Sequence, residues 1–152
     1  MTCKALAKSL VQRFNTRNPF AIADALGYLI IYAPLVGVRG FYQYIKRCHI
    51  IYLDTGLEEN EARFVCAHEL GHSLLHKGCN RIFMDTKTHL LSSRYEQEAD
   101  RFAVDLLFSD DDFRELMALP THTAADCLGI PEGLVRYRME TLLNTMAKQT
   151  AL

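Results

Sequence analysis

The sequence lacks an excess of charge of either sign, and it lacks a long apolar segment. Its formal net charge is -1 over 152 residues, so it has no basic surplus of the kind that marks nucleic-acid-binding proteins. The longest apolar stretch, Leu26–Val38, is too short to cross a bilayer and contains Pro34 and Gly37. We therefore expect neither membrane association nor direct binding to nucleic acid.

Paired cysteines and a secretion signal are also missing. The five cysteines are odd in number and never form a Cys-x-x-Cys pair, a pattern typical of free thiols in a reducing compartment. The first 14 residues contain no long apolar core and no cleavage site of small residues, so they do not resemble a signal peptide. We expect a cytoplasmic protein.

The rest of the sequence predicts one α+β domain over residues 1–152. Hydrophobic residues make up 49% of the chain, and a chain of this length can form a core without metal ions or disulfides. Segments rich in β-branched and aromatic residues predict strands near Tyr28–Ala33, Gly40–Lys46 and His49–Leu53. Their short links favour antiparallel neighbours, which predicts a small, mostly antiparallel three-stranded sheet.

Helical periodicity appears on both sides of these strands. Caps and apolar residues at three- and four-residue steps predict helices over residues 5–14, 18–27, 58–77, 94–108, 111–119, 123–128 and 131–146. The core would span about residues 27–108, with the sheet packed on the helices at 58–77 and 94–108. The helices at about 110–148 would form a tail that either supports the core or resembles a helix-turn-helix. Because the chain is nearly neutral, we favour the supporting role.

Three histidines follow one another at four-residue steps on the predicted helix 58–77. Positions i and i+4 face the same way with Cβ atoms about 5–6 Å apart, so the imidazoles of His68 and His72 can reach one metal ion. Glu69 points about 100° away and can contact a water on that ion instead. This is the His-Glu-x-x-His arrangement of two zinc ligands and a general base.

His76 cannot join the same pair of ligands on a regular helix. It lies about 12 Å from His68 along the helix axis, which is too far for one ion to bind both. We predict that His76 has a structural role or supports one of the ligands.

The motif alone is also compatible with an exposed, charged helix face. However, the segment "RFVCAHELGHSLL" is apolar on both sides of the motif, which predicts a buried helix. Buried histidine and glutamate side chains are costly unless they are paired or bind a metal. This context favours the metal site.

The helix at 94–108 offers a third ligand in "YEQEADRFAVDLL". Glu96 and Asp100 are four residues apart and share a face, so one could bind the metal while the other orients a ligating histidine. Glu98 is the alternative ligand, although on a helix it faces away from that pair. Without a metal, the same segment would be an amphipathic helix with solvated acids.

The two segments together resemble the ImmA/IrrE family of metallopeptidases, among the gluzincin-like zinc proteases. The resemblance covers about residues 27–108 and includes the order of sheet, His-Glu-x-x-His helix, loop and Glu-bearing helix. It implies one Zn2+ per chain and a role for each matching residue: His68, His72 and Glu96 as ligands, Glu69 as general base, and Asp100 as partner of a histidine. The donor that stabilises the oxyanion stays open among Tyr52, His76, His89 and Tyr95.

The resemblance also implies a function. Members are cytoplasmic, are commonly encoded by phages and mobile elements, and in several cases act on a helix-turn-helix repressor. We therefore expect a zinc endopeptidase that cleaves a transcriptional repressor. The alternative is a regulatory binding protein or anti-repressor that keeps the metal site without hydrolysing peptides; the intact Glu69 favours the enzyme. DNA binding through the tail is a weaker third hypothesis.

Overall fold

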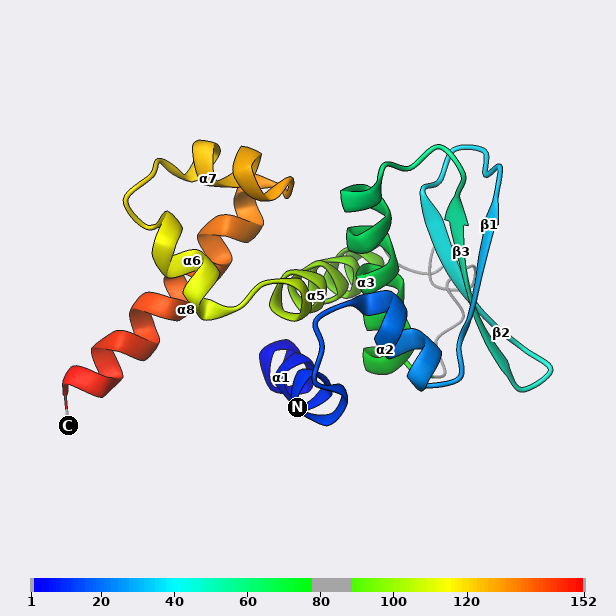
Figure 1. The fold of residues 1–152 in the computed structure, drawn as a ribbon, viewed down its shortest axis with the longest axis horizontal. Coiled ribbons are helices and arrows are strands. Elements are labelled where there is room, and N and C mark those ends of the chain that lie inside the picture. Colours follow the sequence, from blue (N-terminus) through cyan, green and yellow to red (C-terminus); the bar gives the residue numbers. More distant parts are fainter. Residues whose placement is uncertain (1, 78–88, 152) are drawn as a thin grey trace. The chain divides into compact units, whose positions relative to one another are not determined.

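Seven helices and one three-stranded sheet form the described part of this computed structural model, which covers residues 2–77 and 89–151 without the side chains of 89–92 (Figure 1). The elements are α1 (Cys3–Phe14), α2 (Pro19–Ala25), β1 (Leu29–Ala33), β2 (Gly40–Ile45), β3 (Cys48–Asp54), α3 (Glu59–Leu75), α5 (His89–Leu107), α6 (Asp110–Leu116), α7 (Thr121–Leu128) and α8 (Glu132–Thr150). The expected α+β class is confirmed. None of the described helices combines the length and apolar character needed to cross a membrane.

Chain contacts divide the protein into two compact units, Met1–Leu107 and Phe108–Leu152. The first contains the sheet and the four helices α1, α2, α3 and α5. The second contains α6, α7 and α8. A single domain over 1–152 therefore stays a prediction, and each unit is described by itself.

The sheet is mixed, with strand order β1-β3-β2. β2 pairs antiparallel with β3, as the short link between them predicts, from Gly40 opposite Leu53 to Ile45 opposite Cys48. The expectation of antiparallel pairing was wrong for β1, which lies beside β3 and runs parallel to it. The physical reason lies in β3, whose Ile51 and Leu53 are fully buried and make it the central strand.

The central element of the first unit is α3, which packs against β2 and β3 and also against α5. Two glycines allow these close approaches. A Cβ at Gly40 would lie 2.6 Å from Val65 Cγ1 on α3, and a Cβ at Gly71 would lie 2.8 Å from Phe102 Cδ1 on α5. The predicted packing of the sheet on the histidine-bearing helix is thus confirmed, and Gly71 brings the glutamate-bearing helix alongside it.

The helix boundaries lie within four residues of the predictions, apart from the start of α5. Asn18 caps α2 by accepting a hydrogen bond from the Phe20 amide, and Gly27 takes the left-handed conformation (φ 82°) just after that helix. The difference is α5, which begins at His89 rather than near Arg94. α3 ends at Leu75 with His76 as its C-cap, two residues before the predicted end at 77.

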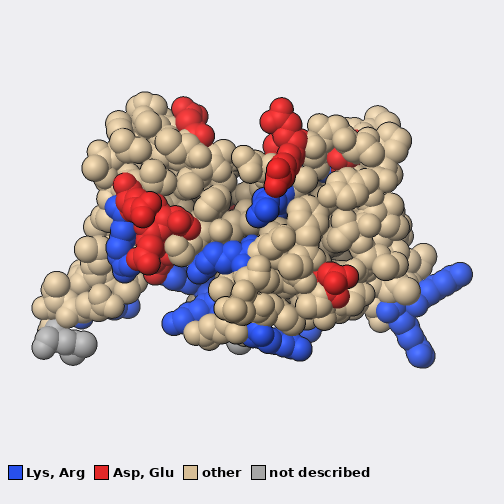
Figure 2. Space-filling model, in the orientation of Figure 1, with Lys and Arg blue, Asp and Glu red and all other residues tan. Residues whose placement is uncertain are grey.

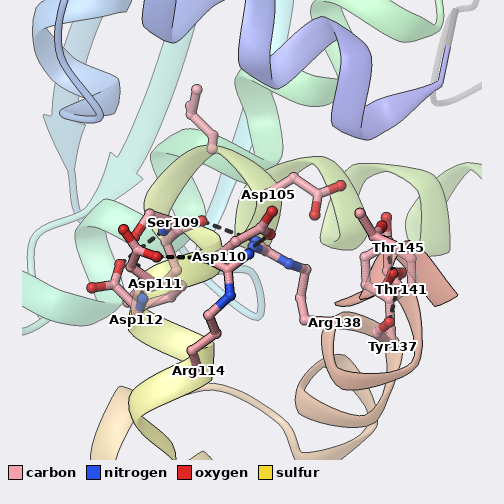
Figure 3. Close-up of polar contacts among 12 residues, drawn as sticks. Asp105, Ser109, Asp110, Asp111, Asp112, Arg114, Tyr137, Arg138, Thr141 and Thr145 are labelled. Carbon is pink, nitrogen blue, oxygen red and sulfur yellow. Dashed lines mark hydrogen bonds and ion pairs between the residues drawn. The ribbon is translucent and has the colours of Figure 1, made fainter. Parts of the chain in front are cut away.

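A buried arginine links two helices of the second unit (Figure 3). Arg138 on α8 is 2% exposed and donates hydrogen bonds to the Phe108 carbonyl and to Asp110 at the start of α6. Its guanidinium also lies 4.5 Å above the Phe113 ring. Ser109 forms a capping box with Asp112, so this helix begins at Asp110, one residue before the predicted start at 111. The arginine therefore joins α8 to α6.

Charges of both signs are spread over the face drawn in Figure 2, and neither sign covers it. The acidic side chains that gather at α6 include its first turn, Asp110, Asp111 and Asp112. Acidic residues at the start of a helix stabilise the helix by interacting favourably with its dipole, which is sufficient reason for this cluster.

Candidate metal centre

Side chains from α3 and α5 meet at one point within the first unit. His68, His72 and Glu96 each offer a ligand atom there, and these atoms lie within 4.8 Å of one another. The two histidines present their Nε2 atoms, which are 3.1 Å apart. Glu96 approaches with both oxygens, Oε2 at 3.1 Å from His68 Nε2 and Oε1 at 2.8 Å from His72 Nε2.

These donors suit a zinc ion. Two nitrogen ligands of a tetrahedral zinc ion at about 2.0–2.1 Å would lie about 3.3 Å apart, close to the separation observed between the two Nε2 atoms. Two imidazoles and one carboxylate are also one of the ligand sets of catalytic zinc sites, which keep a fourth position for water or substrate. The residues present therefore fit the metal.

Asp100 orients the first histidine. Its Oδ1 accepts a hydrogen bond from His68 Nδ1 at 2.8 Å, which points the Nε2 atom at the common point. Burial lowers the pKa of His68, but hydrogen bonds with Asp100 and Glu96 outweigh it and raise the pKa to about 9. Burial raises the pKa of Glu96, but hydrogen bonds from His68 and His72 hold it well below its usual range. The acids thus favour a positive charge at this point.

His76 contacts the second histidine. Its Nδ1 lies 3.1 Å from Nδ1 of His72, so it is a neighbour of a ligand rather than a member of the convergent group. His76 Nε2 lies 2.9 Å from Oε2 of Glu98. Burial lowers the pKa of His76 despite this acidic partner.

Glu98, the alternative third ligand, faces His76 and not the convergent pair. Its carboxylate also accepts a hydrogen bond from Arg94 Nε at 3.1 Å. The hydrogen bond from His76, with that from Arg94, lowers the pKa of Glu98. The helical phase of α5 explains this placement, because residues 96 and 100 share one face and residue 98 lies on another.

Glu69 lines a cleft of about 380 Å³ beside the ligands. It is 2% exposed. One wall of the cleft is the segment Gly37–Gly40, and the other side is formed by α3 and α5, including His68 and Glu96. A water or a peptide carbonyl in this cleft would lie next to both the ligands and a buried carboxylate.

The candidate oxyanion donors lie in different places. Tyr52 alternates with the buried Ile51 and Leu53, so its side chain points to the opposite face of the sheet, where it stacks on Phe41. Tyr95 packs on His76, with ring centroids 4.1 Å apart. The side chain of His89 lies outside the described residues. The structure thus brings neither tyrosine into the lining of the cleft.

Sequence reasoning missed the cleft wall Gly37–Gly40 and the arginine behind Glu98. The only signal for the wall is its pair of glycines, one of which has φ 78°. Arg94 stands one helical turn before Glu98, a spacing that does predict an ion pair.

Comparison with known proteins agrees with this geometry. Residues 23–140 match the sequence model of the IrrE N-terminal-like domain, a peptidase family. The chain is 30% identical over 145 residues to "Metallopeptidase ImmA" of Bacillus subtilis strain 168, covering 91% of this chain and 85% of the relative. It is 39% identical over 108 residues to "Uncharacterized immunity region protein 2" of Bacillus phage phi105, covering 70% of this chain and 68% of the relative.

Proposed function

This chain belongs to the ImmA/IrrE family of metallopeptidases, and on that basis we propose that it is a zinc-dependent endopeptidase. The observation that best supports zinc is the convergence of His68, His72 and Glu96 at distances that suit one tetrahedral ion. When bound, the ion would polarise a substrate carbonyl and lower the pKa of a water molecule.

The residues around the ligands would carry the proton transfers. Glu69 would accept a proton from the attacking water and deliver it to the leaving amine. Its burial at 2% exposure and its position on the cleft support this role. Asp100 would hold His68 in the orientation that leaves Nε2 without a proton.

We further propose that the substrate is a helix-turn-helix repressor of a phage or mobile element, cleaved in the cytoplasm. The relative from phage phi105 is named as a protein of an immunity region, which supports this setting. The described cysteines, Cys3, Cys48, Cys66 and Cys127, are free thiols, as expected in a reducing compartment.

A helix-turn-helix repressor encoded beside this gene would be the candidate substrate, and its cleavage tests the proposal. The purified chain is first assayed for bound metal, then incubated with the repressor, and fragments are read by gel and mass spectrometry. We expect cleavage by the wild type and a loss of at least about 100-fold in the Glu69→Gln variant. Glu59→Gln, an exposed glutamate on the same helix, is the matched control and should cleave normally.

The same variants separate the enzyme from a binding protein. If Glu69→Gln relieves repression in cells as well as the wild type does, the protein acts as a non-proteolytic anti-repressor. DNA binding by the second unit would instead appear as a salt-dependent gel shift with operator DNA.

A further inference from the structure

A chain of hydrogen bonds leads from the second histidine to the surface. It runs from His72 through His76 and Glu98 to Arg94, with contacts of 3.1, 2.9 and 3.1 Å. The exposed fraction of the side chain is 8% at His72 and 4% at His76, and it rises to 30% at Glu98 and 74% at Arg94. Its buried part therefore lies directly beside the ligand.

The direction of these hydrogen bonds follows from the chemistry of the end groups. Arg94 only donates, and the ionised carboxylate of Glu98 only accepts. His76 must then donate from Nε2 to Glu98. A neutral His76 keeps a lone pair on Nδ1, so the contact with His72 requires that His72 donate from its own Nδ1.

A proton on His72 Nδ1 determines the state of the other ring nitrogen, Nε2. Without a metal, His72 Nε2 shares a proton with Glu96, and a metal ion would take the place of that proton. A His72 ring that keeps its proton on Nδ1 would then offer the ion its lone pair on Nε2, the atom that faces Glu96 and His68 Nε2. We propose that His76, itself held by Glu98, is a positioning residue that fixes the tautomer and orientation of His72 for metal binding. This inference rests on the proposed zinc site.

The two ligand histidines are thus supported in different ways. His68 donates directly to a carboxylate, Asp100. His72 donates to an imidazole that in turn donates to a carboxylate. Packing adds to the second arrangement, because the His76 ring is buried and lies against Tyr95. A ring held on both sides cannot easily rotate away from His72.

Measuring the affinity for zinc tests the proposal without relying on peptidase activity. Zinc affinity of the full chain is determined by competition with a chelator, and cobalt(II) absorption reports the ligand set. We expect His76→Phe, which keeps a ring against Tyr95 but has no acceptor, to weaken zinc binding about 10–100-fold. His76→Asn should restore most of that loss, because its side-chain oxygen can take the place of Nδ1.

Glu98 provides a second, less disruptive test. Glu98→Ala should weaken zinc binding about tenfold, and Glu98→Gln should lose less because its amide oxygen still accepts from His76. Glu59→Gln on the exposed face of α3 is the control and should bind zinc as the wild type does.

Each alternative predicts a different pattern. Unchanged zinc affinity in His76→Phe and Glu98→Ala would overturn the proposal. The proposal would also fail if these variants lost zinc affinity only in proportion to their loss of thermal stability and if His76→Asn bound zinc no better than His76→Phe. A cobalt spectrum that loses one nitrogen ligand in His76→Phe would make His76 a ligand instead. If the wild type itself binds no zinc, the proposed function fails first, which distinguishes the two outcomes.

Discussion

Asp100 illustrates how much one residue outside the ligand set can contribute to metal binding. Its carboxylate accepts from His68 Nδ1 at 2.8 Å. We expect Asp100→Ala to weaken zinc binding about 10–100-fold, because the His68 ring loses the group that orients it. Chelator competition measures this loss, and Asp111→Ala, an exposed acid in the second unit, serves as the control. Equal affinity of the two variants would contradict the assignment.

Residue spacing predicted much of the candidate site. The i, i+4 steps of His68 and His72 and of Glu96 and Asp100 each place two side chains on one helical face, which the structure reproduces. Spacing alone could not decide whether Tyr52 is an oxyanion donor. The face of a strand that turns inward depends on the element that covers it.

At the scale of secondary structure, Gly71 sets the distance between the two ligand-bearing helices. A Cβ there would lie 2.8 Å from Phe102 Cδ1 and 3.4 Å from Ala99 Cα, and both of these residues are fully buried. We expect Gly71→Ala to lower the free energy of unfolding by about 1–3 kcal/mol through overpacking. Zinc affinity should fall as well, because Glu96 moves away from the histidines with α5.

Gly133 is the matched control for this substitution. It lies in α8, and a Cβ there would meet nothing within 4 Å. Gly133→Ala should raise the free energy of unfolding by up to about 1 kcal/mol through helix propensity. Urea titration of both variants measures the difference, and a Gly71→Ala variant as stable as Gly133→Ala would contradict the argument.

The turn between β2 and β3 carries two residues in an unfavourable conformation. Lys46 and Arg47 have φ of 49° and 63°, the left-handed region that two-residue hairpin turns require and that Asn-Gly adopts most easily. Replacing both by Asn-Gly should raise the free energy of unfolding by about 1 kcal/mol. Thermal unfolding checks this, with Lys46→Ala, Arg47→Ala as the control that removes the charges but keeps the conformation.

The order of the strands in the sheet could not be predicted from local sequence patterns. Short links make neighbours in the chain the default partners. Here the burial of Ile51 and Leu53 places β3 in the centre, and β1 pairs with it across the sheet. Ile51 and Leu53 are buried because α3 packs on the sheet. The sequence of the strands alone carries no information about that packing.

At the scale of the whole molecule, metal binding and folding should be linked. All three proposed ligands lie in the unit Met1–Leu107 and come from two helices. Zinc at 100 times its dissociation constant should stabilise the folded chain by about 2.7 kcal/mol, provided that the unfolded chain does not bind it. Thermal unfolding with zinc and with a chelator measures the shift, and a His68→Ala, His72→Ala variant should show none.

The family match covers residues 23–140 and so includes parts of both compact units. The sequence predicted the helical character of the second unit, because apolar periodicity and caps are local signals. It did not predict the role of Arg138, whose burial depends on α6 and α8 coming together.

The placement of the ligands on two separate helices has a consequence for how such sequences can vary. A bound ion would tie α3 to α5 on either side of their connection. The entropic cost of closing a connection grows slowly, by about 0.6 kcal/mol for each doubling of its length. Insertions between the two helices should therefore be tolerated among related proteins. A single-residue insertion between His68 and His72, or between Glu96 and Asp100, would rotate one partner by about 100° and separate the pair.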